Sequence, residues 1–242
     1  MKNTNFYKVL NSKIKKNKCL VGIVGVGYVG IQLIIQFNNK KIKTIGFEKD
    51  IKKTNLLKQG LSPYSYIKNK NIRNVKKFST FQNNFESIHK CDVIIICLPT
   101  PIKKNTKPDL SNIVSSFSKI SKKLRKGQLI ILESTTYPGT TRNLIAKKIG
   151  SRFKMGKNLF LSYSPERENP GSKMKFEDVT KICSGYSKNC LNLSKNLYQK
   201  IVKKVVKSNS LEEAEMSKLL ENIYRSVNIG LVNEVKIILK AM

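Results

Sequence analysis

Residues 21–30 read Val-Gly-Ile-Val-Gly-Val-Gly-Tyr-Val-Gly, a short apolar run followed by closely spaced glycines. The apolar residues Leu20–Val24 predict a buried parallel strand. The span Tyr28–Phe37 predicts the helix that follows it. A strand, a tight glycine turn and a helix in this order are the opening unit of a doubly wound α/β fold.

The three glycines have the spacing Gly25-x-Gly27-x-x-Gly30. In this context Gly25 permits the tight turn, Gly27 lets a pyrophosphate approach the backbone, and Gly30 permits close packing of helix on strand. Free N–H groups in the first helical turn, near Tyr28 and Val29, favour phosphates. Although glycines also occur in ordinary turns, their position between a strand and a helix predicts a dinucleotide site.

Glu48 supports the same interpretation. It ends a second predicted strand, Thr44–Glu48, 18 residues after Gly30, close to the usual spacing of about 20. A carboxylate there accepts hydrogen bonds from ribose hydroxyls and disfavours a 2′-phosphate, so we expect NAD rather than NADP. Lys49, Lys52 and Lys53 lie nearby and could offset part of that discrimination.

Two polar segments follow later predicted strands. Cys-Leu-Pro-Thr-Pro occupies residues 97–101 after one of them, and Ser-Thr-Thr-Tyr-Pro-Gly occupies residues 134–139 after another. Open α/β sheets bind ligands at the carboxyl ends of their strands, so Pro99, Thr100 and Thr136 are candidate contacts. The alternative is ordinary turn chemistry, in which the same residue types are common.

Strand-like and helix-like stretches alternate along the chain, which predicts a Rossmann-like doubly wound parallel sheet. We expect a basic N-terminal extension over residues 1–17, either floppy or helical, and an NAD-binding Rossmann domain over residues 18–208. Residues 209–242 would begin a long helical dimerisation domain. Further strands are expected at Lys77–Phe81, Asp92–Leu98, Gln128–Glu133, Leu159–Tyr163, Val179–Cys183 and Val205–Ser208, and helices at Ile51–Gln59, Leu110–Leu124, Thr140–Ile149 and Lys188–Val202.

The last predicted helix starts at Leu211, with Ser210 as its N-cap and acidic residues in its first turn. Its apolar residues recur every three or four positions. They are Met216, Leu219, Leu220, Ile223, Val227, Leu231, Val235 and Ile238. Because such a stripe is rarely left in water, we expect a homodimer formed through residues 211–242.

The composition is strongly basic, with 47 Lys and Arg against 15 Asp and Glu and a formal net charge of +32. The lysines are spread along the whole chain rather than interleaved with aromatics, as a single-strand-binding platform would need. We therefore favour a general compositional bias toward lysine, rather than nucleic-acid binding, as the explanation of the charge. The positive electrostatic field of the chain would still attract an anionic ligand such as a pyrophosphate. The uncharged span Cys19–Phe37 approaches bilayer length, but its glycines favour the strand–turn–helix, so neither a nucleic-acid nor a membrane partner is expected.

Cysteine and histidine usage narrows the chemistry further. The five cysteines form no CxxC pair and are odd in number, which disfavours a disulfide framework or a zinc site and suggests a reduced, cytoplasmic protein. His89 is the only histidine, so histidine triads and multi-histidine metal sites are excluded. We expect no metal.

Five motifs in a fixed order resemble the UDP-glucose/GDP-mannose dehydrogenase family. They are Gly-x-Gly-Tyr-Val-Gly (25–30), Pro-Thr-Pro (99–101), Glu-Ser-Thr-x-Tyr-Pro-Gly-Thr-Thr (133–141), Ser-Pro-Glu-Arg-x-x-Pro-Gly (164–171) and Ala-Glu-x-Ser-Lys-x-x-x-Asn (214–222). The fourth is most similar to that of the UDP-N-acetylglucosamine 6-dehydrogenase branch, which makes uronic acids for surface polysaccharides.

The resemblance implies two hydride transfers to NAD, which convert a sugar C6 alcohol to an acid through a cysteine thioester. It implies that Thr136 and Glu166 position the reacting water or proton. It also implies that Lys218 and Asn222 stabilise the developing oxyanion, and that Glu166, Arg167, Lys218 and Asn222 contact the UDP-sugar. Lys218 and Asn222, four residues apart, share one face of a helix, and such a cation–amide pair suits an alkoxide.

Two features depart from the family pattern. The chain ends at Met242, before the segments that would carry the nucleophilic cysteine and the UDP-binding domain, so we expect this chain alone to be inactive for the full oxidation. Glu48 also stands where many relatives have Asp. The alternative functions are a non-catalytic nucleotide-binding or regulatory fragment that pairs with a full-length relative, and a basic nucleic-acid-binding protein.

Overall fold

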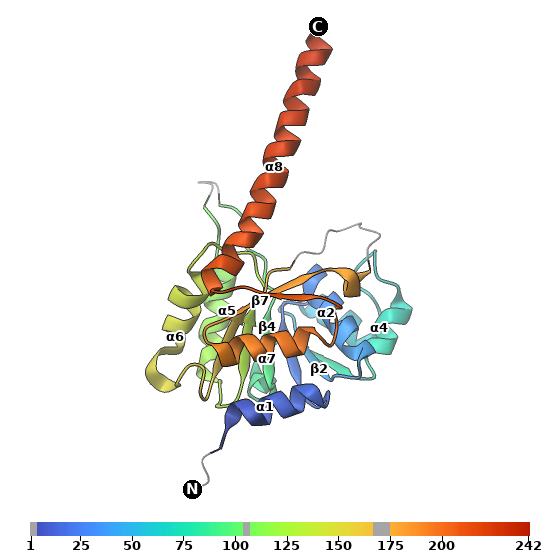
Figure 1. The fold of residues 1–242 in the computed structure, drawn as a ribbon. Helices are drawn as coiled ribbons and strands as arrows, with labels where there is room; N and C mark the ends of the chain where they lie inside the picture. The colour runs from blue at the N-terminus through green and yellow to red at the C-terminus, as the bar shows by residue number, and fades with distance from the viewer. Residues whose placement is uncertain (1–3, 104–106, 167–174) are drawn as a thin grey trace.

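A computed structural model describes residues 4–103, 107–166 and 175–242. In this part of the chain, eight strands form one sheet in the order β3-β2-β1-β4-β5-β6-β7-β8, with helices on both faces (Figure 1). The strands are β1 (Val21–Val24), β2 (Thr44–Phe47), β3 (Ser79–Gln82), β4 (Val93–Ile96), β5 (Leu129–Leu132), β6 (Phe160–Tyr163), β7 (Lys181–Gly185) and β8 (Val205–Lys207). The α-helices are α1 (Phe6–Lys15), α2 (Tyr28–Asn39), α3 (Ile51–Gln59), α4 (Asn69–Val75), α5 (Ser111–Lys122), α6 (Lys147–Ile149), α7 (Lys188–Tyr198) and α8 (Leu211–Ala241). Short helical turns of other types are η1 (Glu86–Lys90), η2 (Thr141–Ala146), η3 (Gly150–Arg152) and η4 (Phe176–Asp178).

The sheet confirms the predicted Rossmann-like fold. The order of β3 to β6 is 3-2-1-4-5-6, and β1 pairs in parallel with both β2 and β4. The strand order reverses between β1 and β4, which is where doubly wound sheets bind their ligands. One expectation is wrong in detail, because β7 runs antiparallel to β6. An antiparallel neighbour starts at the end where the preceding strand finishes and so needs no crossover.

Alternation along the strands divides the core between the two faces. In β4, Val93 and Ile95 join the cluster under α2 and α7, whereas Ile94 and Ile96 join the cluster under α5. Successive side chains of a strand point to opposite faces. A strand covered on both faces is therefore apolar throughout, which is why these short runs were readable in the sequence.

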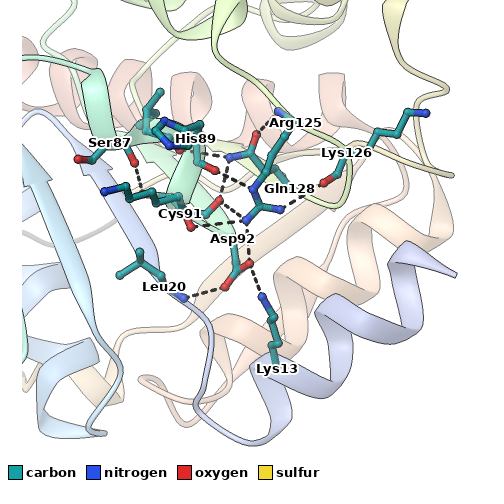
Figure 2. Close-up of polar contacts among 11 residues, drawn as sticks. Lys13, Leu20, Ser87, His89, Cys91, Asp92, Arg125, Lys126 and Gln128 are labelled. Carbon is teal, nitrogen blue, oxygen red and sulfur yellow. Dashed lines mark hydrogen bonds and ion pairs between the residues drawn. The ribbon is translucent and has the colours of Figure 1, made fainter. Parts of the chain in front are cut away.

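The N-terminal extension forms α1 and packs against the domain. Leu10 and Ile14 are buried in the core cluster that includes α7. Asp92, at the start of β4, accepts hydrogen bonds from Lys13 Nζ at 2.8 Å and Leu20 N–H at 3.1 Å (Figure 2). Arg125 Nη2 approaches the same carboxylate at 3.0 Å. The Asp92 carboxylate thus connects α1, the residue before β1 and the turn before β5. These contacts lie at the amino-terminal end of the strands, opposite the end that carries the glycine turn.

The last helix projects from the body of the molecule (Figure 1). Ser210 Oγ accepts from Glu213 N–H at 3.0 Å, which confirms Ser210 as the N-cap. The first turns of α8 are packed, with Leu211 and Ala214 in the core, and from Ile223 onward every side chain is exposed. Of the helices in the described ranges, none combines the length and apolar character that crossing a membrane requires.

Candidate functional site

A cavity of about 1050 Å³ lies at the carboxyl ends of β1, β4, β5 and β6. It brings together most of the residues singled out in the sequence. Its lining includes Gly25, Gly27, Tyr28, Val29, Glu48, Pro99, Thr100, Glu166 and Lys218. Ser134 and Thr135 also line it. The cavity therefore extends from the glycine turn to the first turns of α8.

The glycine turn has the geometry that a dinucleotide needs. Gly25 adopts φ +90°, where a side chain is strained, and a Cβ there would lie 2.7 Å from the Cys97 carbonyl oxygen. A Cβ on Gly30 would lie 2.0 Å from the Gly25 carbonyl oxygen, so Gly30 serves packing and does not line the cavity. A Cβ on Gly27 would meet no atom within 4 Å. The fold does not require glycine at position 27. The close approach of a phosphate to the backbone does require it.

The start of α2 completes this phosphate cradle. Gly27 is its N-cap, and no side chain caps the helix there. Uncapped N–H groups at a helix N-terminus favour an anion. The residues present therefore fit a bound pyrophosphate.

Glu48 is held in place by the backbone. Its Oε2 accepts from Val26 N–H and its Oε1 accepts from Asp50 N–H, both at 3.1 Å. Each carboxylate oxygen retains further acceptor capacity, so Glu48 can still receive a ribose hydroxyl. Lys49 and Lys53 line the same cavity.

An aromatic group beside the glycine turn was missed by sequence reasoning. The Tyr64 hydroxyl donates to the Val26 carbonyl, within the turn itself. The Tyr66 ring lies 5.5 Å from that of Tyr64 and 5.2 Å from that of Tyr28, between ring centroids. Nothing in the local pattern around Tyr64 signals a contact 38 residues away.

The other end of the cavity holds the candidate acid–base and oxyanion groups. Glu166 and Lys218 both line it. Burial lowers the pKa of the Lys218 ammonium, against the opposing effect of Glu221 and Glu166. Asn222 is half-buried one turn further along α8 and is not part of the lining.

Two further candidates are placed differently. Thr136 is buried and does not line the cavity, and its hydroxyl lies against the buried hydroxyl of Tyr163. Arg167 lies outside the described residues.

A buried ionic cluster behind Glu166 was also missed. Lys181 Nζ lies 2.7 Å from Glu166 Oε2 and 3.0 Å from Glu133 Oε2. The Tyr198 hydroxyl donates to Glu133 Oε1. Burial raises the pKa of Glu133 to about 7, against the lowering effect of Lys181. Burial opposes the charge on Lys181, but the two carboxylates outweigh it and keep the pKa of Lys181 above its ordinary value.

Glu215 fixes α8 to the loop after β5. It is fully buried and accepts from Gly139 N–H at 2.6 Å, Thr141 N–H at 2.7 Å and Thr141 Oγ1 at 2.6 Å. The helix expected over Thr140–Ile149 begins instead as the π-helical turn η2, whose first residue, Thr141, donates to this carboxylate. Because Lys218 lies one helical turn after Glu215, the same bonds place Lys218 at the cavity.

The cysteines offer no activated nucleophile. Burial raises the pKa of every one of the five thiols, to about 12 for Cys19 and Cys91 and to about 11 for Cys183. Cys97 alone lines the cavity, and Glu133 adds to the effect of burial on its pKa. A reactive cysteine needs a lowered pKa, so these thiols are unsuited to covalent catalysis at neutral pH. Among the described residues, no cluster of three or more His, Cys, Asp or Glu side chains could hold a metal ion.

Comparison with known proteins agrees with this geometry. The family model described as "UDP-glucose/GDP-mannose dehydrogenase family, NAD binding domain" matches residues 19–202. The chain is 35% identical over 228 residues to the UDP-N-acetyl-D-glucosamine 6-dehydrogenase of Pseudomonas aeruginosa, covering 92% of this chain and 53% of that protein. It is 36% identical over 222 residues to protein CapL of Staphylococcus aureus, covering 90% and 52%.

A solved structure shows the same fold. The UDP-N-acetyl-mannosamine dehydrogenase Cap5O from Staphylococcus aureus superposes with a TM-score of 0.81 at 29% identity, covering 89% of this chain and 53% of that one. The chain thus spans about half the length of these relatives.

Proposed function

Because the chain belongs to the UDP-glucose/GDP-mannose dehydrogenase family, we propose that it provides the cofactor site and part of the sugar site of a nucleotide-sugar 6-dehydrogenase. The family's NAD binding domain accounts for residues 19–202, and NAD is its cofactor. One observation carries the proposal: a single cavity joins Gly27 and Glu48 to Glu166 and Lys218. Such a cavity lets a cofactor at one end meet an alcohol at the other.

The substrate class we propose is a UDP-hexose, with UDP-N-acetylglucosamine or a close relative first. The names of the relatives support this, since they include UDP-N-acetyl-D-glucosamine 6-dehydrogenase and UDP-N-acetyl-D-mannosamine dehydrogenase. The product would be a uronic acid for surface polysaccharide synthesis.

In the proposed mechanism, the protein orients two partners and moves one proton. NAD, when bound, accepts a hydride from the sugar C6. Gly27 and the start of α2 would hold its pyrophosphate, and Glu48 its adenosine ribose. Lys218, with Asn222 on the same helix, would stabilise the developing alkoxide. Glu166 would accept the proton, directly or through a water held by Thr136.

Completion of the four-electron oxidation needs an activated thiolate. The pKa of each of the five thiols here is raised. We therefore propose that this chain alone does not release uronic acid in quantity. All five cysteines are free and four are buried, which supports a reducing compartment such as the cytoplasm.

Assembly through α8 is part of the proposal. Exposed apolar side chains on this helix include Leu220, Ile223, Val227, Val235 and Ile238. A continuous exposed apolar face favours association. We propose a homodimer formed through residues 211–242; pairing with a longer relative through the same face is the second candidate.

The test combines binding and chemistry in the 242-residue chain. NADH is titrated by fluorescence, and UDP-N-acetylglucosamine is then added with NAD while NADH and uronic acid are both followed. We expect saturable cofactor binding and little or no uronic acid. Absence of cofactor binding at millimolar concentration would contradict the cofactor site, and uronic acid formed in stoichiometric yield would contradict the argument about the thiols. The variant Lys218→Met, which keeps the cofactor end intact, is the matched control for any NADH produced.

A further inference from the structure

The buried cluster behind the cavity contains one ammonium and two carboxylates. The Lys181 side chain is 2% exposed, that of Glu133 is 0% exposed, and that of Glu166 is 11% exposed. The three side chains come from β7, the end of β5 and the segment after β6. Both acids line the cavity, but only Glu166 has part of its side-chain surface open.

Each contact in the cluster has a defined direction. Glu133 receives Lys181 on Oε2 and the Tyr198 hydroxyl on Oε1. The ammonium lies 5.0 Å from the centre of the Tyr198 ring. Lys181 is therefore held by Tyr198 and by Glu133, whose fully buried side chain lies at the cavity wall, and its ammonium also contacts Glu166 at 2.7 Å.

Burial of such charges needs a reason beyond stability. Removing an ammonium and carboxylates from water is unfavourable, and apolar side chains in the same space are often as stable or more stable. Charged clusters with shifted pKa values are enriched at functional sites. Here the cluster includes Glu166, a partly exposed acid that lines the cavity together with Lys218.

We propose that Lys181 is a positioning residue that holds the Glu166 carboxylate ionised and fixed at the cavity wall, with Glu133 and Tyr198 holding Lys181 in turn. The proposal rests on the proposed function, in which Glu166 accepts a proton from the reacting alcohol or water. A proton acceptor must be both ionised and within reach of its donor. Lys181 provides both conditions without touching the substrate.

The surrounding ionisable groups agree with this division of roles. The ionisable groups around Lys181 and Glu166 are Cys97 after β4, Glu133 after β5, Tyr163 on β6, Cys183 on β7, Tyr198 on α7 and Lys218 on α8. The pKa of both thiols and of both tyrosines is raised by burial, so these four groups are neutral at neutral pH. Glu133, whose pKa is raised to about 7, takes up the first proton as the pH falls to neutral. The Lys181 ammonium then pairs with the ionised Glu166 carboxylate.

The experiment is a carboxyl titration by ¹³C NMR on the full chain, with labelled glutamate and with the Glu166 signal assigned through Glu166→Gln. In the unmodified chain, we expect the Glu166 signal to titrate below the ordinary glutamate value of about 4.3. Glu133→Gln keeps the Lys181–Glu166 contact and should leave that midpoint unchanged or lower. The double variant Lys181→Met/Glu133→Gln removes the cation without leaving Glu133 charged and unpaired, and should raise the midpoint by about one pH unit or more.

Two results would overturn the proposal. One is a Glu166 midpoint at or above the ordinary value in the unmodified chain, which decides the matter even if no variant folds. The other is an unchanged midpoint in a folded double variant, because a merely structural Lys181 would leave Glu166 unaffected. NADH titration of the same samples separates this test from the proposed function: loss of cofactor binding in the unmodified chain would contradict the function and leave the carboxyl titration valid.

Discussion

Two glycines of the same turn should respond in opposite ways to the addition of one methyl group. A Cβ on Gly30 would lie 2.0 Å from the Gly25 carbonyl oxygen and 3.1 Å from an Ile23 methyl group. The nearest atom belongs to the backbone and cannot rotate away. A Cβ on Gly27 would meet no atom within 4 Å. Gly30→Ala should therefore damage the fold, whereas Gly27→Ala should spare the fold and damage cofactor binding.

The magnitudes follow from these distances. Overpacking against a rigid neighbour typically costs about 1–3 kcal/mol, and we expect Gly30→Ala at or above the upper end. Gly27 has φ −83° and ψ −157°, which alanine adopts without strain. Reduced entropy of the unfolded chain favours the alanine by roughly 0.4–1 kcal/mol, and the poorer helix cap opposes it by a similar amount. The stability of Gly27→Ala should thus stay within about 1 kcal/mol of the unmodified chain.

Urea unfolding and NADH fluorescence titration measure the two effects separately. Gly27→Ala should weaken NADH binding at least tenfold, or about 1.4 kcal/mol, because its methyl group occupies the space through which a pyrophosphate approaches. Wild-type affinity in a folded Gly27→Ala variant would refute the cradle. Equal destabilisation by the two substitutions would refute the packing argument.

The remaining predictions concern cofactor choice, pH and assembly. NADP should bind at least tenfold more weakly than NAD because of Glu48, with equal affinity in parallel titrations counting against the assignment, and Glu48→Gln should narrow the difference. Because burial raises the pKa of Glu133 from 4.5 to about 7, the folded state holds that proton more tightly than the unfolded state. The resulting stability is fully present below pH 4.5 and is lost as the pH rises through 7, on the order of 3 kcal/mol. In Glu133→Gln, the free energy of unfolding should no longer show this dependence on pH. The same pH dependence in the variant and the unmodified chain would contradict the prediction. In light scattering at micromolar concentration, the chain should be dimeric or larger, and Val227→Glu, at a position 63% exposed, should shift it toward monomer; a monomeric unmodified chain would exclude the association surface.

Much of the fold follows from local sequence because its signals are local. The apolar runs of β1, β4 and β5 are fully buried. A strand covered on both faces is apolar at nearly every position, so it is easily recognised in the sequence. Helix α8 begins at its predicted cap. The antiparallel direction of β7 was not predictable, since periodicity within a strand carries no information about the direction of its neighbour.

The site was predicted in part for the same reason. The glycine turn, Glu48 and the Pro99–Thr100 segment are marked by short motifs, and one cavity contains them all. The roles assigned to Thr136, Glu166, Lys218 and Asn222 stay predictions. The Lys181 contact with Glu133 joins residues 48 apart, which no local pattern reports. One signal was available: a lysine inside an apolar strand expected to be buried must find a charged partner.

The anchoring of α8 at its base makes the helix a lever. A firm attachment near the base of the helix is the Glu215 carboxylate, which accepts three bonds of 2.6–2.7 Å from Gly139 and Thr141. From there to Ala241, at about 1.5 Å per residue, the helix extends roughly 39 Å. A rotation of about 5° at Glu215 would move the far end by about 3 Å but Lys218 by only about 0.4 Å. A small rearrangement of the loop at Gly139–Thr141 would therefore displace the distal end of the helix much further than it displaces Lys218. Conversely, a constraint on the distal end would fix the orientation of the helix and with it the position of Lys218 at the cavity.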